Sequence, residues 1–66
     1  MTNEERGKLI RRLLADKGWS QMDLARATSL DKNTIHNIIN GKNKSVRLKS
    51  LEEIADALEV STTILV

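Results

Sequence analysis

The sequence contains no cysteine and no proline, and its only aromatic side chain is Trp19. Without cysteine the chain can form neither a disulfide framework nor a thiolate zinc site. Its apolar runs span only two to three residues, so they indicate neither a membrane span nor a signal-peptide core, and we expect a cytoplasmic protein. A core with a single aromatic ring must consist mainly of aliphatic side chains, which suits packed helices.

The residue sets that carry catalysis or bind metals are also missing. His36 is the only histidine, there is no tyrosine, and no H-x-x-x-H, C-x-x-C or glycine-rich phosphate loop occurs. Most carboxylates fall in the first turns of predicted helices, where the helix dipole favours them. Because no nucleophile–base set is present, we expect no enzyme activity, cofactor, metal ion or small-molecule ligand.

Charge is distributed unevenly along a chain that has room for one small domain, residues 1–66. Residues 26–49 hold six lysines and arginines against one aspartate, whereas residues 50–66 hold four carboxylates and no cation. A basic middle third beside an acidic tail suggests that one face meets a polyanion, although a solvated helical surface explains the charges equally well.

Capping signals divide the chain into four predicted helices and a short fifth element. In the first two helices a threonine or serine precedes an acidic residue by three positions, which is the pattern of a capping box. Gly18 and Gly41 are expected to end the first and third helices, and Gly7 is a local weakness inside the first. We therefore predict an all-α fold, a compact bundle of four to five short helices. The predicted N-cap residues are Thr2, Ser20, Asp31, Ser50 and Ser61.

The second and third predicted helices, about residues 21–27 and 32–40, suit a helix-turn-helix over residues 20–40. Their joint of three to four residues is too short for long antiparallel packing and favours a wide crossing. At 100° per residue, the isoleucines of the third helix cluster on one side and its polar residues on the other. The polar side holds Lys32, Asn33, His36, Asn37 and Asn40.

The asparagines on this polar side are informative because asparagine is a mediocre helix former. An amide presents a donor and an acceptor side by side, which matches the edge of adenine in the major groove. Asn33 could simply sit in the first turn and Asn40 could simply help to end the helix. These explanations do not suit Asn37, which is the strongest candidate for reading a base.

Three separated motifs, at residues 19–25, 34–42 and 51–61, resemble the Cro/cI-type (XRE-like) helix-turn-helix family of phage and bacterial repressors. The sequence departs from the family at Ser29, where glycine is usual in the turn, so we expect a slightly reshaped turn. It departs again at Ile39, where many members carry glutamate, and we expect this side chain to pack inward against the first helix.

The resemblance implies a lambda-repressor-like fold and a sequence-specific regulator of transcription that binds double-stranded DNA as a homodimer. Repression by occupying a promoter is the favoured role, and activation from the same site is the alternative. Its third helix would read the major groove. The implied base-reading residues are Lys32, Asn33, His36 and Asn37. The implied phosphate contacts are Gln21, Thr34, Asn40, Lys42, Asn43, Lys44 and Arg47.

Two further sets of residues are assigned on weaker grounds. Arg11 and Arg12 are possible phosphate contacts, but a solvated surface of the first helix is the favoured interpretation for both. The short apolar tail needs burial, which makes Val60, Ile64 and Val66, with parts of the 46–49 segment, the candidates for a dimer interface.

The main alternative is a protein-interaction adaptor of the same fold, antitoxin-like or coactivator-like, whose basic loop holds an acidic partner. The asparagine-rich side of the third helix argues against it, since helices that bind proteins usually expose an apolar stripe.

Overall fold

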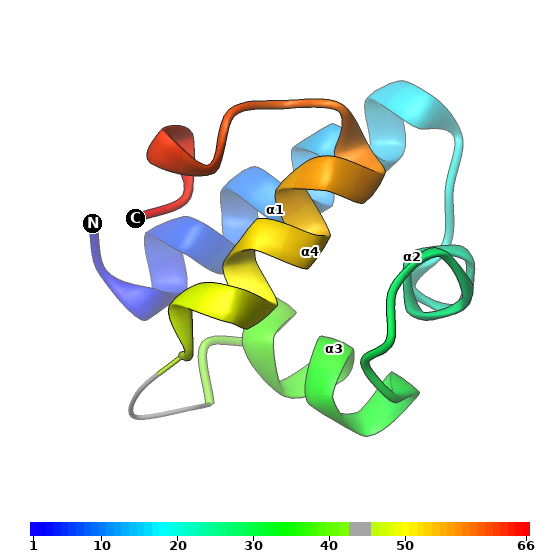
Figure 1. The fold of residues 1–66 in the computed structure, drawn as a ribbon. Coiled ribbons are helices and arrows are strands. Elements are labelled where there is room, and N and C mark those ends of the chain that lie inside the picture. Colours follow the sequence, from blue (N-terminus) through cyan, green and yellow to red (C-terminus); the bar gives the residue numbers. More distant parts are fainter. Residues whose placement is uncertain (43–45) are drawn as a thin grey trace.

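A computed structural model describes residues 1–42 and 46–66, and every regular element in these ranges is a helix (Figure 1). The predicted all-α bundle of short helices is therefore confirmed. No helix in the described ranges is long and apolar enough to cross a membrane. In chain order the elements are α1 (Asn3–Lys17), α2 (Gln21–Ala27), α3 (Lys32–Ile39), α4 (Leu48–Leu58) and the 3-10 turn η1 (Thr62–Ile64).

Four of the predicted N-caps are confirmed by their hydrogen bonds, one of them Ser61, whose hydroxyl accepts from the backbone N–H of Thr63 at 3.4 Å. The Thr2 hydroxyl accepts from the backbone N–H of Glu5 at 3.1 Å, and the Glu5 carboxylate accepts from the N–H of Thr2 at 3.0 Å. Ser20 and Asp23 form the same reciprocal pair at 3.2 and 2.8 Å. Asp31 accepts from the backbone N–H of Thr34 at 2.7 Å. Each bond satisfies a donor that a helix start would otherwise leave unpaired.

The predicted cap at Ser50 is wrong, because α4 begins two residues earlier, at Leu48. Arg47 is the N-cap and makes no side-chain capping bond. Its carbonyl oxygen accepts from the N–H of Leu51 at 3.2 Å. This backbone bond belongs to a helical turn that a helix starting after Ser50 would not contain, so the extra turn replaces the serine cap.

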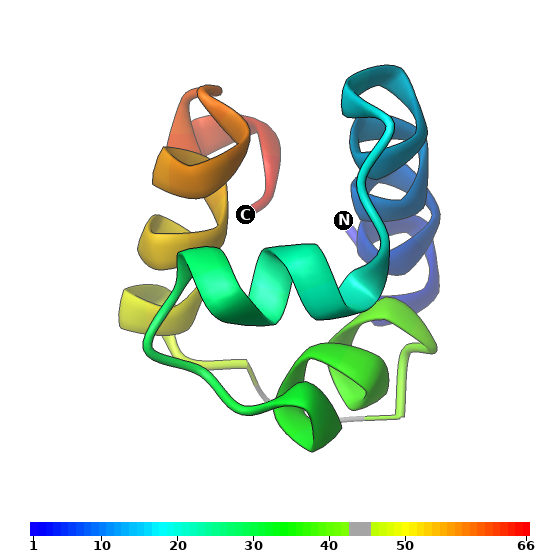
Figure 2. The same ribbon diagram turned by 90° about the vertical axis from the view of Figure 1, so that its right-hand side faces the viewer.

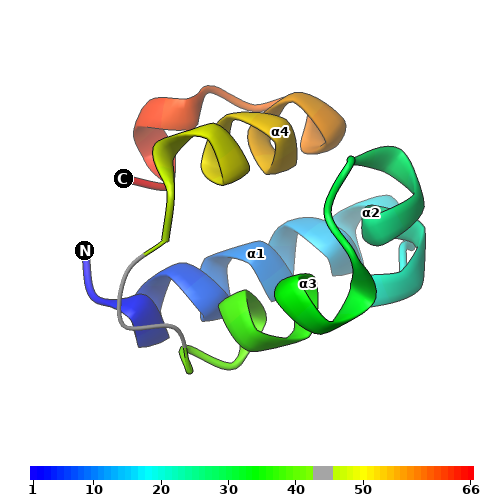
Figure 3. The ribbon, with the colours of Figure 1, turned by 60° about the horizontal axis from the view of Figure 1, so that its bottom comes forward.

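The helices enclose one aliphatic core. Figure 2 shows α2 crossing between α1 and α4, with α3 on the outer side of α2, and Figure 3 shows α3 lying beside α1. The chain end closes the core, because Leu65 is fully buried and its carbonyl oxygen accepts from Arg6 Nε at 2.6 Å. The buried apolar residues are Ile10, Leu14, Leu24, Ile35, Ile38, Ile39, Leu51, Ile54, Ala55, Leu58 and Leu65.

Gly7 marks the closest approach of two helices. A Cβ atom built on Gly7 would lie 2.0 Å from the carbonyl oxygen of Ile39, well inside van der Waals contact. Gly7 is buried rather than an exposed weakness, and it lets the backbone of α1 touch the C-terminal end of α3. Ile39 packs inward beside α1, as the sequence predicted.

Gly7→Ala should lower the free energy of unfolding by about 1–3 kcal/mol, because the added methyl group meets backbone that cannot move aside. This loss of stability is expected although alanine is a better helix former than glycine by about 1 kcal/mol. Urea denaturation followed by circular dichroism measures it. Ala15→Gly, at an exposed position of the same helix, reports the intrinsic helix preference alone. A Gly7→Ala protein as stable as the wild type would contradict the close approach.

Candidate nucleic-acid interface

The joint between α2 and α3 is tied to α4 by one carboxylate. Glu53 accepts hydrogen bonds from the Ser29 hydroxyl and from the Ser29 backbone N–H, the second at 2.9 Å. These bonds lower the pKa of Glu53 below its ordinary value, the hydroxyl bond having the larger effect. The joint therefore has an anchor outside the two helices that it connects.

The serine in this turn does not strain the backbone. The non-glycine residue with positive φ in the described ranges is Glu59, so Ser29 does not adopt the left-handed conformation that favours glycine. The departure from the family's glycine at Ser29 therefore puts no left-handed serine in the turn. Its side chain forms the bond to Glu53 instead, which a glycine could not form.

The two sides of α3 differ as the sequence predicted. Ile35, Ile38 and Ile39 are buried in the core. Lys32, Asn33 and His36 are exposed, and Asn37 is half-buried on the same helix. The four base-reading candidates thus lie on the side of α3 that remains accessible.

Polar side chains at the outer surface of α2 and α3 are linked to one another. Nδ1 of His36 lies 3.2 Å from Oε1 of Gln21, which joins the first residue of α2 to the second half of α3. Asn40, the C-cap residue of α3, donates from Nδ2 to the carbonyl oxygen of His36 at 2.8 Å. His36 and Asn40 therefore sit in a partly pre-arranged surface rather than as independent side chains.

The remaining phosphate candidates lie around this surface. Lys42 and Arg47 are exposed, and Thr34 is half-buried in the first turn of α3. Asn43 and Lys44 lie outside the described residues. Lys32, Lys42 and Arg47 each carry a positive charge and Asp31, the N-cap residue of α3, carries a negative one, so these four residues together are net positive.

The apolar tail has an exposed and a buried part. Ile64 and Val66 are 40% and 52% exposed, whereas Val60 packs against the core and is half-buried. Leu48, in the 46–49 segment that was a further candidate for this interface, is 58% exposed. A surface hollow beside it is lined by Leu48, Glu52, Thr62, Thr63 and Val66.

Within residues 1–42 and 46–66, no group of three or more histidines, aspartates and glutamates could hold a metal ion. The chemistry of the surface on α2 and α3 is that of amides, hydroxyls and cations. Such groups recognise phosphates and base edges.

Two short helices joined by a tight turn, the second with an exposed amide-rich side and basic surroundings, define a helix-turn-helix domain. The chain belongs to the Cro/C1-type helix-turn-helix DNA-binding family, since that domain matches residues 9–63. It is a DNA-binding regulator of transcription.

A solved structure supports the same fold. The restriction-modification controller protein C.AhdI from Aeromonas hydrophila is similar, with a TM-score of 0.88 and 28% sequence identity. The match covers 97% of this chain and 91% of that chain. A comparison with curated proteins gives no match.

Glu53→Gln should lower the thermal midpoint at neutral pH, since a neutral amide accepts the two Ser29 bonds less strongly than a carboxylate. The folded-state pKa of Glu53 is lowered, so its stabilisation is present above the unfolded-state pKa and is lost as pH falls through the folded value. The difference between wild type and variant should therefore disappear in acid. Thermal melts from neutral to acidic pH test this, with the adjacent Glu52→Gln as control; equal melting curves for both variants would refute the anchor.

Proposed function

We propose that the protein is a repressor that inserts α3 into the major groove of double-stranded DNA. One observation carries the proposal. The isoleucine side of α3 is buried, which leaves the side with Lys32, Asn33 and His36 accessible to a ligand. An α-helix fits the width of the major groove of B-form DNA, where each base pair presents a distinct pattern of donors and acceptors.

In this arrangement four side chains of α3 read base edges. Asn33 and Asn37 suit adenine, whose N7 and N6 groups pair with the two ends of an amide. Lys32 suits the O6 and N7 acceptors of guanine. His36 is the fourth candidate, and its bond to Gln21 limits how far its ring can turn.

Phosphate contacts would hold the helix in register without reading sequence. Lysines and an arginine neutralise phosphates, and amides and hydroxyls donate to their oxygens. The proposed phosphate contacts are Gln21, Thr34, Asn40, Lys42, Asn43, Lys44 and Arg47.

A second copy of the chain would complete the site. One recognition helix reads only a few base pairs, so helix-turn-helix proteins bind as two-fold dimers to half-sites about one helical turn apart. We propose that Val60, Ile64 and Val66 form this interface, together with Leu48, which lines the same hollow as Val66. Exposed apolar side chains gathered in one place are typical of such interfaces.

The proposed repression follows from where such a dimer binds. A dimer that occupies a promoter blocks RNA polymerase from it, and transcription of the gene is thereby repressed. The similarity to a restriction-modification controller protein supports a role in controlling transcription.

Asn37→Ala should weaken binding to the selected site by about 1–3 kcal/mol and relax the preference at one base position. Selection from a randomised duplex library at a stated salt concentration defines that site, and anisotropy titrations then compare the variants. Lys42→Ala, which removes a phosphate contact, should weaken all duplexes alike and lower the salt slope by about one.

The losses of affinity on selected and on random duplexes show whether a residue reads a base or contacts a phosphate. If Asn37→Ala weakens selected and random duplexes equally, Asn37 does not read a base. If the wild type instead copurifies with a tight protein partner and retards no duplex at low salt, the adaptor function replaces the proposed one.

Ile64→Lys should raise the dissociation constant of the dimer on the order of tenfold, because the interface would have to bury an unpaired ammonium group. The variant should still fold, since Ile64 is 40% exposed. Sedimentation velocity over a range of protein concentrations, with and without duplex DNA, measures the change. Ala15→Lys is the control, since Ala15 is exposed and lies on α1. A wild type that stays monomeric on DNA, or equal effects of the two lysines, would rule out this interface.

A further inference from the structure

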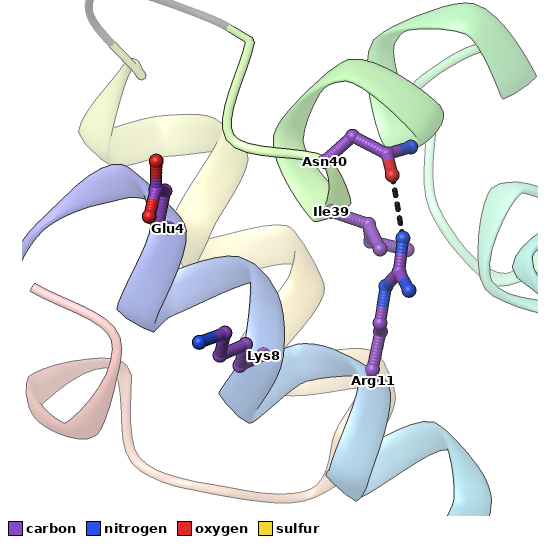
Figure 4. A pocket seen from close by; sticks show the side chains of 5 residues that line it. All are labelled: Glu4, Lys8, Arg11, Ile39 and Asn40. Carbon is purple, nitrogen blue, oxygen red and sulfur yellow. Dashed lines mark hydrogen bonds between the residues drawn. The ribbon is translucent and has the colours of Figure 1, made fainter.

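The structure separates two arginines that look equivalent in the sequence. Arg11 and Arg12 are adjacent and exposed on α1. Nη2 of Arg11 donates to Oδ1 of Asn40, the C-cap residue of α3 (Figure 4). Arg11 is therefore drawn toward the polar surface of α3.

The close approach at Gly7 explains why this contact forms. Gly7 lies against the carbonyl of Ile39, and Arg11 is one helical turn beyond Gly7 on the same face of α1. Asn40 directly follows Ile39 at the end of α3. The packing that buries Ile39 thus brings the guanidinium within reach of the Asn40 amide.

The Asn40 amide is itself held in one orientation. Its nitrogen donates to the carbonyl oxygen of His36 at 2.8 Å, so its oxygen is the atom that faces Arg11. A guanidinium has five N–H donors and can approach a phosphate with two of them at once. A side chain held in place loses less conformational freedom when it binds.

The partner of Arg11 leaves its charge uncompensated. Asn40 is neutral, and the ion pair among the described residues joins Lys17 to Glu59, away from this site. Residues 43–45 contain no carboxylate in the sequence. The hollow beside Arg11 is lined by Glu4, Lys8, Arg11, Ile39 and Asn40, and Figure 4 shows Lys8 between Arg11 and Glu4 along α1.

We propose that Arg11 binds a backbone phosphate of the DNA and extends the interface from the helix-turn-helix onto α1, with Asn40 as its positioning residue. This inference rests on the proposed function, because it needs a duplex seated on α3. Arg12, which has the same charge and sits one residue later on the helix, has no such role.

Arg11→Ala and Arg12→Ala form a matched pair for the test. The probe is a labelled random-sequence duplex, titrated by fluorescence anisotropy at several salt concentrations, because phosphate contacts do not depend on sequence. Arg11→Ala should weaken binding about three- to tenfold and lower the salt slope by about one. Arg12→Ala should leave the salt slope unchanged. Arg11→Lys, which keeps the charge, should restore most of the slope.

A double-mutant cycle tests the positioning by Asn40. In an Asn40→Ala background, Arg11→Ala should cost less affinity than it does in the wild type, because the guanidinium is no longer held toward the DNA. Independent contacts would give additive losses, which would refute the positioning role. Circular dichroism melts check that each variant remains folded.

The outcomes separate this inference from the proposed function. If the wild type binds the duplex and the two alanine variants lose equal affinity and slope, the role of Arg11 is overturned and the proposed function stands. If the wild type binds no duplex at low salt, both are overturned.

Discussion

The contact between Gly7 and the carbonyl of Ile39 sets the orientation on which the other features of this protein depend. Because no side chain separates the backbones there, α3 lies directly against α1 and buries its isoleucines. A rotation of α3 by one residue, about 100°, would turn a polar side chain into the core. The accessible amide side of the helix is thus a consequence of packing at its opposite side.

An eight-residue helix such as α3 is too short to be stable alone, so its ends are held by other parts of the chain. Asp31 caps its start, and the bonds of Ser29 to Glu53 connect the preceding turn to α4. At its other end, Asn40 bonds both to the helix itself and to Arg11 of α1. The proposed recognition surface is therefore supported by α1 and α4, which contribute few of its residues.

Features that depend on neighbours within one helical turn were predictable from the sequence. Thr2, Ser20 and Asp31 cap their helices because each bonds an N–H only three residues away. The cap at Ser50 was predicted by the same reasoning and failed, since a further turn from Leu48 could form in its place. A capping signal shows that a helix can start at a residue, but it does not show that no earlier start is better.

The sequence by itself determined the all-α fold, the two sides of α3 and the family, because helical periodicity and motif spacing are properties of neighbouring residues. Only the tertiary structure decided that Gly7 is buried, that Ser29 bonds Glu53 and that Arg11, but not Arg12, meets Asn40. Arg11 and Asn40 are 29 positions apart. Such contacts depend on how helices pack against each other, and a pattern within one helix does not predict which residues of another helix it will meet.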